Sequence, residues 1–549
     1  MPQTIDILNA RDLLTGRPMA LRLRDGQIEY AGDPTDWPAP KGQRIDAAGG
    51  WLSAGFCDSH LHLFWGGVTL NQLNLLDVHD RDSAARAITA FAATRPEGEV
   101  ICAYSANYDL LGPGTRPDRR ALDTLLPDRP LLIRAVDGHA AWANTVALRL
   151  AGLMDHVPAL RGAEVVLDAD GRPNGELREG AAIEPVTRLT ANAGRELLGI
   201  GGVEPETPPD PDQRARDKAT LATAMATCAA FGITTAVNMD GNLYQADLLT
   251  EMAQAGELPI RVVLPMTLAP DHDDARIDRL IAAAGRAPVG KLSFGWIKMF
   301  MDGVFDTWTA FRTDDYPGRP GVRSAPLFAP PRFAEICRKA DAAGLQIEVH
   351  CVGDGAVRAT LDGYAAARAA NGPRDARHRI EHIDMLHPDD LARIKALGVV
   401  ASMQPVHPPG SSGLPLEPTI SIMGRHRWAD TFPWAALAAA GVPLAFGTDW
   451  PTAPLSPLNA IHAALSRQPW AAEMPDQRLP FAEVIAAYTR GGAYPLFEET
   501  RRGTLAPGQA ADVILLEGDP QALATAPEAC RVVLTLCDGV ILHTELPQC

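Results

Sequence analysis

Near its N-terminus the sequence reads Ala54-Gly55-Phe56-Cys57-Asp58-Ser59-His60-Leu61-His62, an apolar run that ends in two histidines one residue apart. Side chains at positions i and i+2 of a β-strand point to the same face, so the two imidazoles are predicted to lie side by side at a strand end. Zinc and similar ions bind neutral imidazole together with carboxylate oxygen. Two histidines can also meet at a strand end by chance. The pair therefore predicts half a metal site, which the rest of the chain must complete.

Eight short apolar runs, including this one, are interpreted as strands. They end near His62, Val237, Pro265, Lys298, His350, His382, Gln404 and Asp449. From the second run onward, most are separated by segments of helical length, such as 333–343 and 389–397. Strands that alternate with helices predict an α/β fold with a parallel sheet, and eight such units predict a (β/α)₈ TIM-like barrel. We expect this barrel domain over residues 54–499.

A large insertion follows the first predicted strand. It covers about residues 65–217 and contains apolar runs of its own at 100–105 and 131–136. We interpret it as a subdomain that would cover the barrel mouth.

The two ends of the chain resemble each other. Asp25-Gly26 and Asp538-Gly539 each stand between alternating apolar runs, and Asp-Gly in such a setting is a strong hairpin signal. We expect the hairpins to pair into one small β-sandwich domain, built from residues 1–53 and 500–549.

Composition limits the possible partners and location. The chain has 549 residues and a net charge of −17, which argues against nucleic acid and anionic membrane surfaces as partners. No apolar run approaches the 18 or so residues of a membrane span, and the N-terminus has no signal-peptide pattern. The eight cysteines are scattered without a CxxC pair, as in reduced cytosolic proteins. A cytoplasmic location is expected.

Polar residues gather where the predicted strands end, which is the active-site end of a (β/α)₈ barrel. Taken singly, each is weak evidence, because a histidine on an apolar strand is often a core residue and an aspartate often caps a helix. The set is His60, His62, Lys298, His350, His382 and Asp449. Their equivalent positions predict one catalytic metal centre.

The same residues resemble the metal-dependent amidohydrolase superfamily, and more narrowly its amidohydrolase-3 branch of YtcJ-like proteins and N-substituted formamide deformylases. The motifs that carry the resemblance are the His60-Leu-His62 strand, Lys298-Met-Phe-Met-Asp302-Gly303, His350-Cys-Val-Gly-Asp354, Glu381-His382, Gly447-Thr-Asp449, the insertion segments 137–144 and 174–179, and the C-terminal segment 503–512. Ala54 replaces the family's usual proline. Val304-Phe305-Asp306 replaces a frequent run of small residues, which leaves the substrate preference open.

The resemblance implies a role for each strand-end residue. His60 and His62 would bind the more buried ion together with Asp449, and His350 and His382 would bind a second ion. Lys298, carboxylated by carbon dioxide in related enzymes, would bridge the two. Zinc is the expected ion. The alternative is that Lys298 pairs with Asp302 and that a single ion binds.

The implied mechanism needs a base and a substrate pocket. Asp449 would take a proton from water and later deliver it to the leaving nitrogen. His139 would either hydrogen-bond the developing oxyanion or pack within the insertion. The predicted substrate contacts come from mouth loops: Trp65, Trp142, Trp308 and Trp450, with Gln404 and His407 after the seventh strand.

The resemblance implies a hydrolase that cleaves a non-peptide carbon–nitrogen bond, of the amide or formamide type, in a small molecule. The alternative on the same scaffold is a deaminase or a cyclic amide hydrolase. Mononuclear deaminases of the superfamily usually carry glutamate three residues after the fifth-strand histidine, where this chain has Gly353. A non-catalytic scaffold is a third hypothesis, but such proteins lack several of the ligands. The sequence leaves open whether the chain forms a homodimer.

Overall fold

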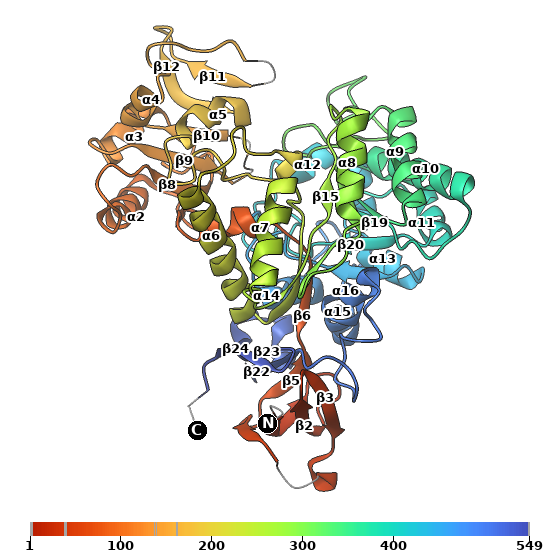
Figure 1. Cartoon of the computed structure of the whole chain (residues 1–549). Helices are drawn as coiled ribbons and strands as arrows, with labels where there is room; N and C mark the ends of the chain where they lie inside the picture. Colours follow the sequence, from red (N-terminus) through yellow and green to blue (C-terminus); the bar gives the residue numbers. More distant parts are fainter. Residues whose placement is uncertain (1–3, 38–40, 137, 139, 161–162, 547–549) are drawn as a thin grey trace. The chain divides into compact units, whose positions relative to one another are not determined.

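The computed structural model describes residues 4–37, 41–136, 138, 140–160 and 163–546 (Figure 1). Its contacts divide the chain into two compact units. The larger unit comprises Met1–Leu63, Gly199–Glu204 and Met225–Cys549. The smaller unit comprises Phe64–Leu198 and Pro205–Ala224. Each unit is described by itself.

Two parallel sheets form the centre of the larger unit. Their strand orders are β16-β14-β13-β6 and β15-β17-β18-β19-β20-β21. The strands are β6 (Phe56–Leu61), β13 (Ile233–Asn238), β14 (Arg261–Val263), β15 (Met266–Thr267), β16 (Leu292–Ser293), β17 (Trp296–Phe300), β18 (Gln346–Cys351), β19 (Arg379–His382), β20 (Val400–Met403) and β21 (Leu444–Phe446). They are short and mostly buried, as expected for strands covered by helices on the outside.

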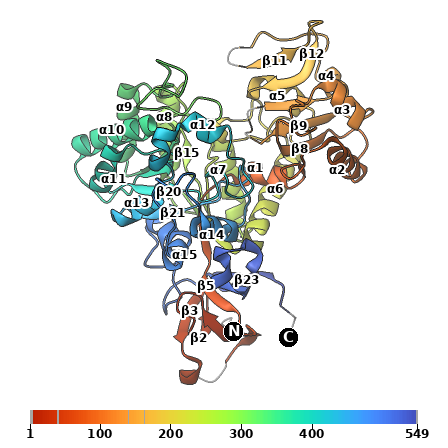
Figure 2. The same ribbon diagram turned by 180° about the vertical axis from the view of Figure 1, so that it is seen from behind.

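Helices connect these strands in the order that the sequence pattern predicts. They include α7 (Leu243–Gln254), α8 (Asp274–Ala284), α9 (Pro330–Ala342), α10 (Asp354–Asn371), α11 (Leu391–Leu397), α13 (Trp434–Ala439), α14 (Pro457–Ser466) and α15 (Phe481–Tyr488). In both views, α8 to α11 lie outside the strands (Figures 1 and 2). The predicted α/β class is confirmed.

Backbone hydrogen bonds join the two parallel sheets where β6 lies beside the segment that follows β21. After β21, the amide of Asp449 donates to the carbonyl oxygen of His60 (2.7 Å), and the amide of His62 donates to that of Trp450 (2.8 Å). At the other edge, the chain itself links the two sheets, because β14 continues into β15 across Leu264 and Pro265, and β16 continues into β17 across Phe294 and Gly295. The bonds after β21 place His60 and His62 beside Asp449, and the closed barrel stays a prediction.

Strands from both termini share a further sheet in the larger unit. Its order is β24-β23-β22-β5-β1-β2-β3, with β4 on β1. The strands are β1 (Thr4–Asp12), β2 (Pro18–Arg24), β3 (Gln27–Gly32), β4 (Gln43–Asp46), β5 (Trp51–Ala54), β22 (Val513–Gly518), β23 (Cys530–Cys537) and β24 (Val540–Thr544). Both Asp-Gly pairs form hairpin turns in the left-handed region, with φ of 50° and 80° at Asp25-Gly26 and 51° and 73° at Asp538-Gly539. Because β5 leads into β6, this sheet supports the first strand of the parallel sheets.

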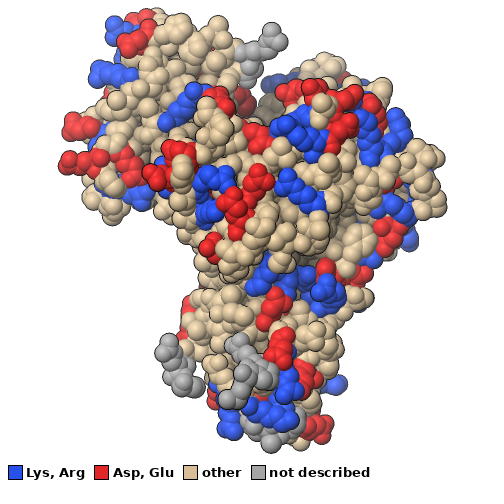
Figure 3. All heavy atoms as spheres, in the orientation of Figure 1, with Lys and Arg blue, Asp and Glu red and all other residues tan. Residues whose placement is uncertain are grey.

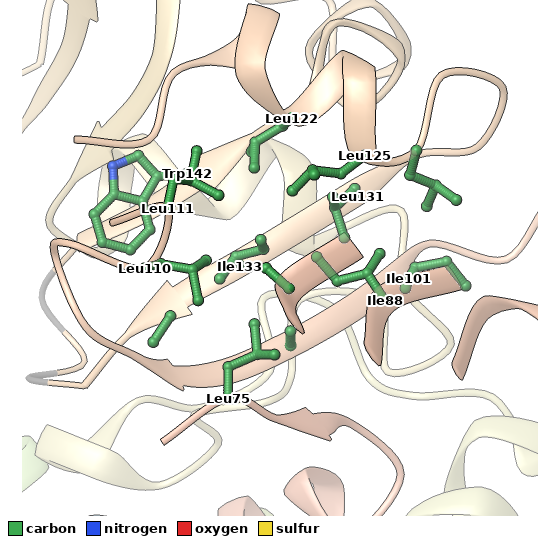
Figure 4. Close-up of a cluster of buried hydrophobic side chains, with 14 of the residues drawn as sticks. Leu75, Ile88, Ile101, Leu110, Leu111, Leu122, Leu125, Leu131, Ile133 and Trp142 are labelled. Atoms are coloured by element: carbon green, nitrogen blue, oxygen red, sulfur yellow. The ribbon is translucent and has the colours of Figure 1, made fainter. Parts of the chain in front are cut away.

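The smaller unit has its own sheet and core. The strand order is β11-β12-β10-β9-β8-β7, and the strands are β7 (Leu73–Asn74), β8 (Ile101–Ala106), β9 (Leu131–Ala135), β10 (Ala140–Ala143), β11 (Glu164–Leu167) and β12 (Pro173–Arg178). Leucine and isoleucine side chains from β8, β9, α2 (Arg81–Ala93) and α3 (Arg119–Leu125) pack into one cluster (Figure 4). A separate core of this kind is what a stable subdomain requires.

Acidic and basic side chains are interspersed over the face shown in Figure 3. Within the described ranges, no helix is both long and apolar enough to cross a bilayer. All seven cysteines in this part of the chain are free thiols.

Candidate metal centre

Three buried side chains at strand ends converge closely enough to share an ion. Ligand atoms of His60, His382 and Asp449 all lie within 4.8 Å of one another. They come from the ends of β6 and β19 and from the residue three positions after β21. His382 and Asp449 both have positive φ, 76° and 56°, which is uncommon for residues other than glycine and clusters at functional sites. The chain thus turns sharply at both strand ends, where these ligands stand.

The Asp449 carboxylate lies among imidazoles. Its Oδ1 is 3.0 Å from His62 Nε2 and 3.5 Å from His60 Nε2, and its Oδ2 is 3.3 Å from His407 Nε2. Burial alone would raise the pKa of Asp449, but the neighbouring histidines outweigh burial and hold it well below its ordinary value. Asp449 is therefore ionised, as a ligand for a cation must be.

Three of the predicted histidine ligands, His60, His350 and His382, have pKa values below the ordinary range. Burial and the nearby Lys298 lower the pKa of His60 to about 4 and that of His350 to about 3. The His350 ring lies 4.4 Å from that of His382, and its Nε2 donates to the carbonyl oxygen of Gly303 (3.2 Å). Neutral imidazole is the form that binds metal.

His62 differs from these three. Burial disfavours its charged form, but the carboxylates of Asp240 and Asp449 outweigh burial and raise its pKa to about 10. Its Nδ1 is 2.5 Å from Asp240 Oδ1. A ligand histidine flanked by two carboxylates must release a proton when a cation binds.

Lys298 is fully buried in β17, opposite Glu348 of β18. Within the described part of the chain, its Nζ has no hydrogen-bond partner. Burial lowers the pKa of Lys298, although Glu381 and Glu348 oppose the shift. A buried amine that loses its proton can react with carbon dioxide, so this environment suits the predicted carboxylation, which stays a prediction.

Asp302, the alternative partner of Lys298, is hydrogen-bonded to backbone amides instead. The Asp302 carboxylate accepts hydrogen bonds from the amides of Val352 (3.0 Å), Gly353 (2.8 Å) and Phe311 (2.9 Å). The proposed Lys298–Asp302 pair is therefore wrong. Asp302 instead joins the loops that follow β17 and β18.

A buried arginine holds part of the site together. Arg379 donates to Glu381 (2.9 and 3.0 Å), to Glu348 (2.9 Å), to the carbonyl oxygen of Ser59 (2.5 Å) and to Ser402 Oγ (2.9 Å). Burial alone would raise the pKa of Glu381, but Arg379 and His60 outweigh burial and lower it. The paired Glu381 then accepts from His60 Nδ1 at 2.7 Å.

Four of the predicted substrate contacts lie in the larger unit, namely His407 beside Asp449, Gln404, Trp450 and Trp308. Gln404 is buried, and its Oε1 accepts from His382 Nδ1 (2.8 Å). Trp450 is buried directly after Asp449. Trp308 is half-buried in the loop after β17, with the Arg319 guanidinium 3.7 Å from the centre of a ring. Their contact with substrate stays a prediction.

The insertion residues differ from their predicted placement. Trp142 lies in β10, not in a loop, and is fully buried in the hydrophobic cluster with its ring edge against Tyr108 (Figure 4). A large apolar ring in the strand Ala140–Ala143 gains more from burial than from exposure in a loop. Trp65 lies in the helix α1 (Leu63–Thr69). His139 lies outside the described residues.

Two carboxylates at the site were missed from the sequence. Asp240 follows β13 and holds His62, and the rule that functional residues stand at strand ends would have found it. Asp58 is buried in β6 and accepts from the amide (3.1 Å) and hydroxyl (2.7 Å) of Thr448. It ties the first strand to the segment that carries Asp449.

Comparison with known proteins identifies the family. The sequence model of the amidohydrolase family, Amidohydro_3, matches residues 43–543. The chain belongs to the amidohydrolase family. The family predicted from the motifs is confirmed, and with it the prediction of an enzyme that hydrolyses carbon–nitrogen bonds.

Relatives of this amidohydrolase match it over nearly its whole length. YtcJ of Bacillus subtilis (strain 168) is 27% identical over 96% of this chain and 96% of its own. The N-substituted formamide deformylase of Arthrobacter pascens is 24% identical over 95% of this chain and 94% of its own. A solved metal-dependent hydrolase of Pyrococcus horikoshii OT3 is similar in fold, with a TM-score of 0.73 at 23% identity, over 96% of this chain and 99% of its own.

Proposed function

We propose that this amidohydrolase uses divalent metal to hydrolyse a linear, non-peptide amide of a small molecule, with N-substituted formamides as the first class to test. The observation that carries the proposal is the convergence of His60, His382 and Asp449 beside the fully buried Lys298, whose Nζ has no hydrogen-bond partner among the described residues. The Arthrobacter pascens relative, a deformylase of N-substituted formamides by name, supports the choice of substrate.

The residues fit one or two ions. His60, His62 and Asp449 would hold the first ion, and His350 and His382 the second, with Lys298 as a carboxylated bridge. This donor set of imidazole nitrogen and carboxylate oxygen suits zinc and other first-row divalent ions. A bound ion would supply Lewis acidity, which lowers the pKa of water and polarises a carbonyl group.

The chain's own residues move the proton. Asp449 is ionised and buried, and its carboxylate would take a proton from the attacking water. The same carboxylate would then deliver this proton to the leaving nitrogen, so that an amine departs. His407, 3.3 Å from Asp449 Oδ2, would orient the carboxylate for both steps. Gln404, Trp308 and Trp450 would contact the substrate.

The alternative function is that of a deaminase or a cyclic amide hydrolase, and the residue at position 353 bears on it. Gly353 stands where mononuclear deaminases usually carry glutamate, and it has no space for a side chain because a Cβ there would lie 2.1 Å from the carbonyl oxygen of Phe311. This observation favours hydrolysis of linear amides.

We expect protein purified without added metal to contain at least about one equivalent of a divalent ion and to hydrolyse N-substituted formamides in preference to lactams and amino-heterocycles. Elemental analysis measures the ion, and amine release measures hydrolysis across the panel. Prolonged chelation should abolish amine release, and the analysed ion should restore it. Full activity in metal-free protein would contradict the proposal, and turnover of lactams or amino-heterocycles alone would favour the alternative.

A further inference from the structure

One buried carboxylate at the site has a single hydrogen-bond partner among the described residues. Asp240 stands two residues after β13 and is fully buried. Its Oδ1 lies 2.5 Å from His62 Nδ1. Within the described part of the chain, its Oδ2 is buried without a hydrogen-bond partner. Burying a carboxylate is costly unless it is paired, so this placement needs a reason, and the direct contact with His62 supplies one.

The backbone holds Asp240 tightly. A Cβ on Gly241 would lie 1.5 Å from the carbonyl oxygen of Pro265, and a Cβ on Gly199 would lie 1.9 Å from the carbonyl oxygen of Asp240 itself. The carbonyl oxygen of Gly241 also accepts from the amide of Thr267 (2.8 Å). Neighbouring chain segments thus approach Asp240 closely on two sides. The carboxylate is therefore held at a defined position rather than on a free loop.

The contact selects which nitrogen of His62 faces the ligand cluster. With Nδ1 donating to Asp240, His62 presents Nε2, which lies 3.0 Å from Asp449 Oδ1. The partner of one ring nitrogen decides the tautomer and the orientation of the other, and it raises the basicity of a metal-binding imidazole.

His60 and His382 are held in the same way but by different partners. Glu381 accepts from His60 Nδ1, yet its charge is also shared with Arg379. His382 Nδ1 meets the neutral amide of Gln404. In the described structure, Asp240 therefore differs from Glu381 in making no ion pair besides that with His62. Substitution of Asp240 therefore removes the hydrogen bond to His62 without breaking a wider network of ion pairs.

We propose that Asp240 is a positioning residue that fixes His62 with Nε2 toward the metal and strengthens it as a ligand. This inference rests on the proposed function, because it assigns Asp240 to the metal that the function requires.

The test compares the zinc affinity of metal-free wild type with that of Asp240→Asn, measured by competition with a chromophoric chelator. Asparagine keeps the volume and removes the charge. We expect about 10–100-fold weaker binding, the usual cost of losing such a partner. Asp6→Asn is the matched control, since Asp6 is also fully buried but pairs with Arg22 in the terminal sheet, and it should bind zinc like the wild type.

A double-mutant cycle separates positioning from a general structural effect. In a His62→Ala background, Asp240→Asn should change zinc affinity by less than about twofold, because the residue through which Asp240 acts is gone. Circular dichroism and the unfolding midpoint verify the fold, and Asp240→Ala serves as the second variant. Wild-type zinc affinity in folded Asp240→Asn, or an equal loss in the His62→Ala background, would overturn the inference. Wild-type protein that binds no zinc would instead contradict the proposed function.

Discussion

Asp449→Asn is expected to lower kcat for amide hydrolysis by about 10²–10⁴-fold while the protein stays folded, which is the range for loss of a general acid–base group. The carboxylate lies 3.0 Å from His62 and 3.5 Å from His60, and its pKa is held well below the ordinary value, so it is ionised and free of the proton that a base must take up. An amide of the same shape can still offer an oxygen to a cation, but it cannot take up the proton of water. Steady-state kinetics, with elemental analysis of the same preparation, measure both effects.

The control for this variant is a buried carboxylate remote from the histidines. Asp390 is buried and pairs with Arg358 and Arg393 at the start of α11. Asp390→Asn should keep wild-type kcat, even if its unfolding midpoint falls. Retained turnover in Asp449→Asn that contains metal would refute the assigned base.

Lys298→Met is expected to reduce the bound metal to one equivalent or less. It should also weaken binding of the remaining metal by at least about 10–100-fold, because losing even a residue that only hydrogen-bonds a metal ligand has a cost of that size. Methionine fills the fully buried site with an unbranched apolar side chain, so the strand should keep its packing. Hydrolysis should fall with the metal content. Elemental analysis and kinetics at saturating zinc provide the measurement.

The smaller variant Lys298→Ala tests the carboxylate bridge itself. It leaves space in which a short carboxylic acid can replace the missing group, so added acetate or propionate should restore part of the metal content and activity. Chloride at the same ionic strength is the control. Unchanged metal content and turnover in Lys298→Met would contradict a bridging role.

The strand ends were predictable because periodicity and length suffice to recognise short buried strands. The predicted end at His382 coincides with the end of β19, and those at His62 and Gln404 lie one residue beyond β6 and β20. The placement of Trp142 was not predictable in this way. A tryptophan near a polar motif suits either a loop or a core, and the cluster that contains Trp142 draws on other segments of the chain, such as those of Ile88 and Leu122.

The sequence by itself determined the family, and it predicted a ligand set because parallel strands bring their carboxyl ends to one edge, whatever the details of packing. Only the tertiary structure decided how each ligand is held. Asp240 and His62 are 178 residues apart, and Glu381 and His60 are 321 residues apart. Hydrogen bonds between such residues depend on the packing of separate strands, which leaves no local pattern in the chain. Which ring nitrogen of His62 faces Asp449 is therefore a property of the fold rather than of any motif.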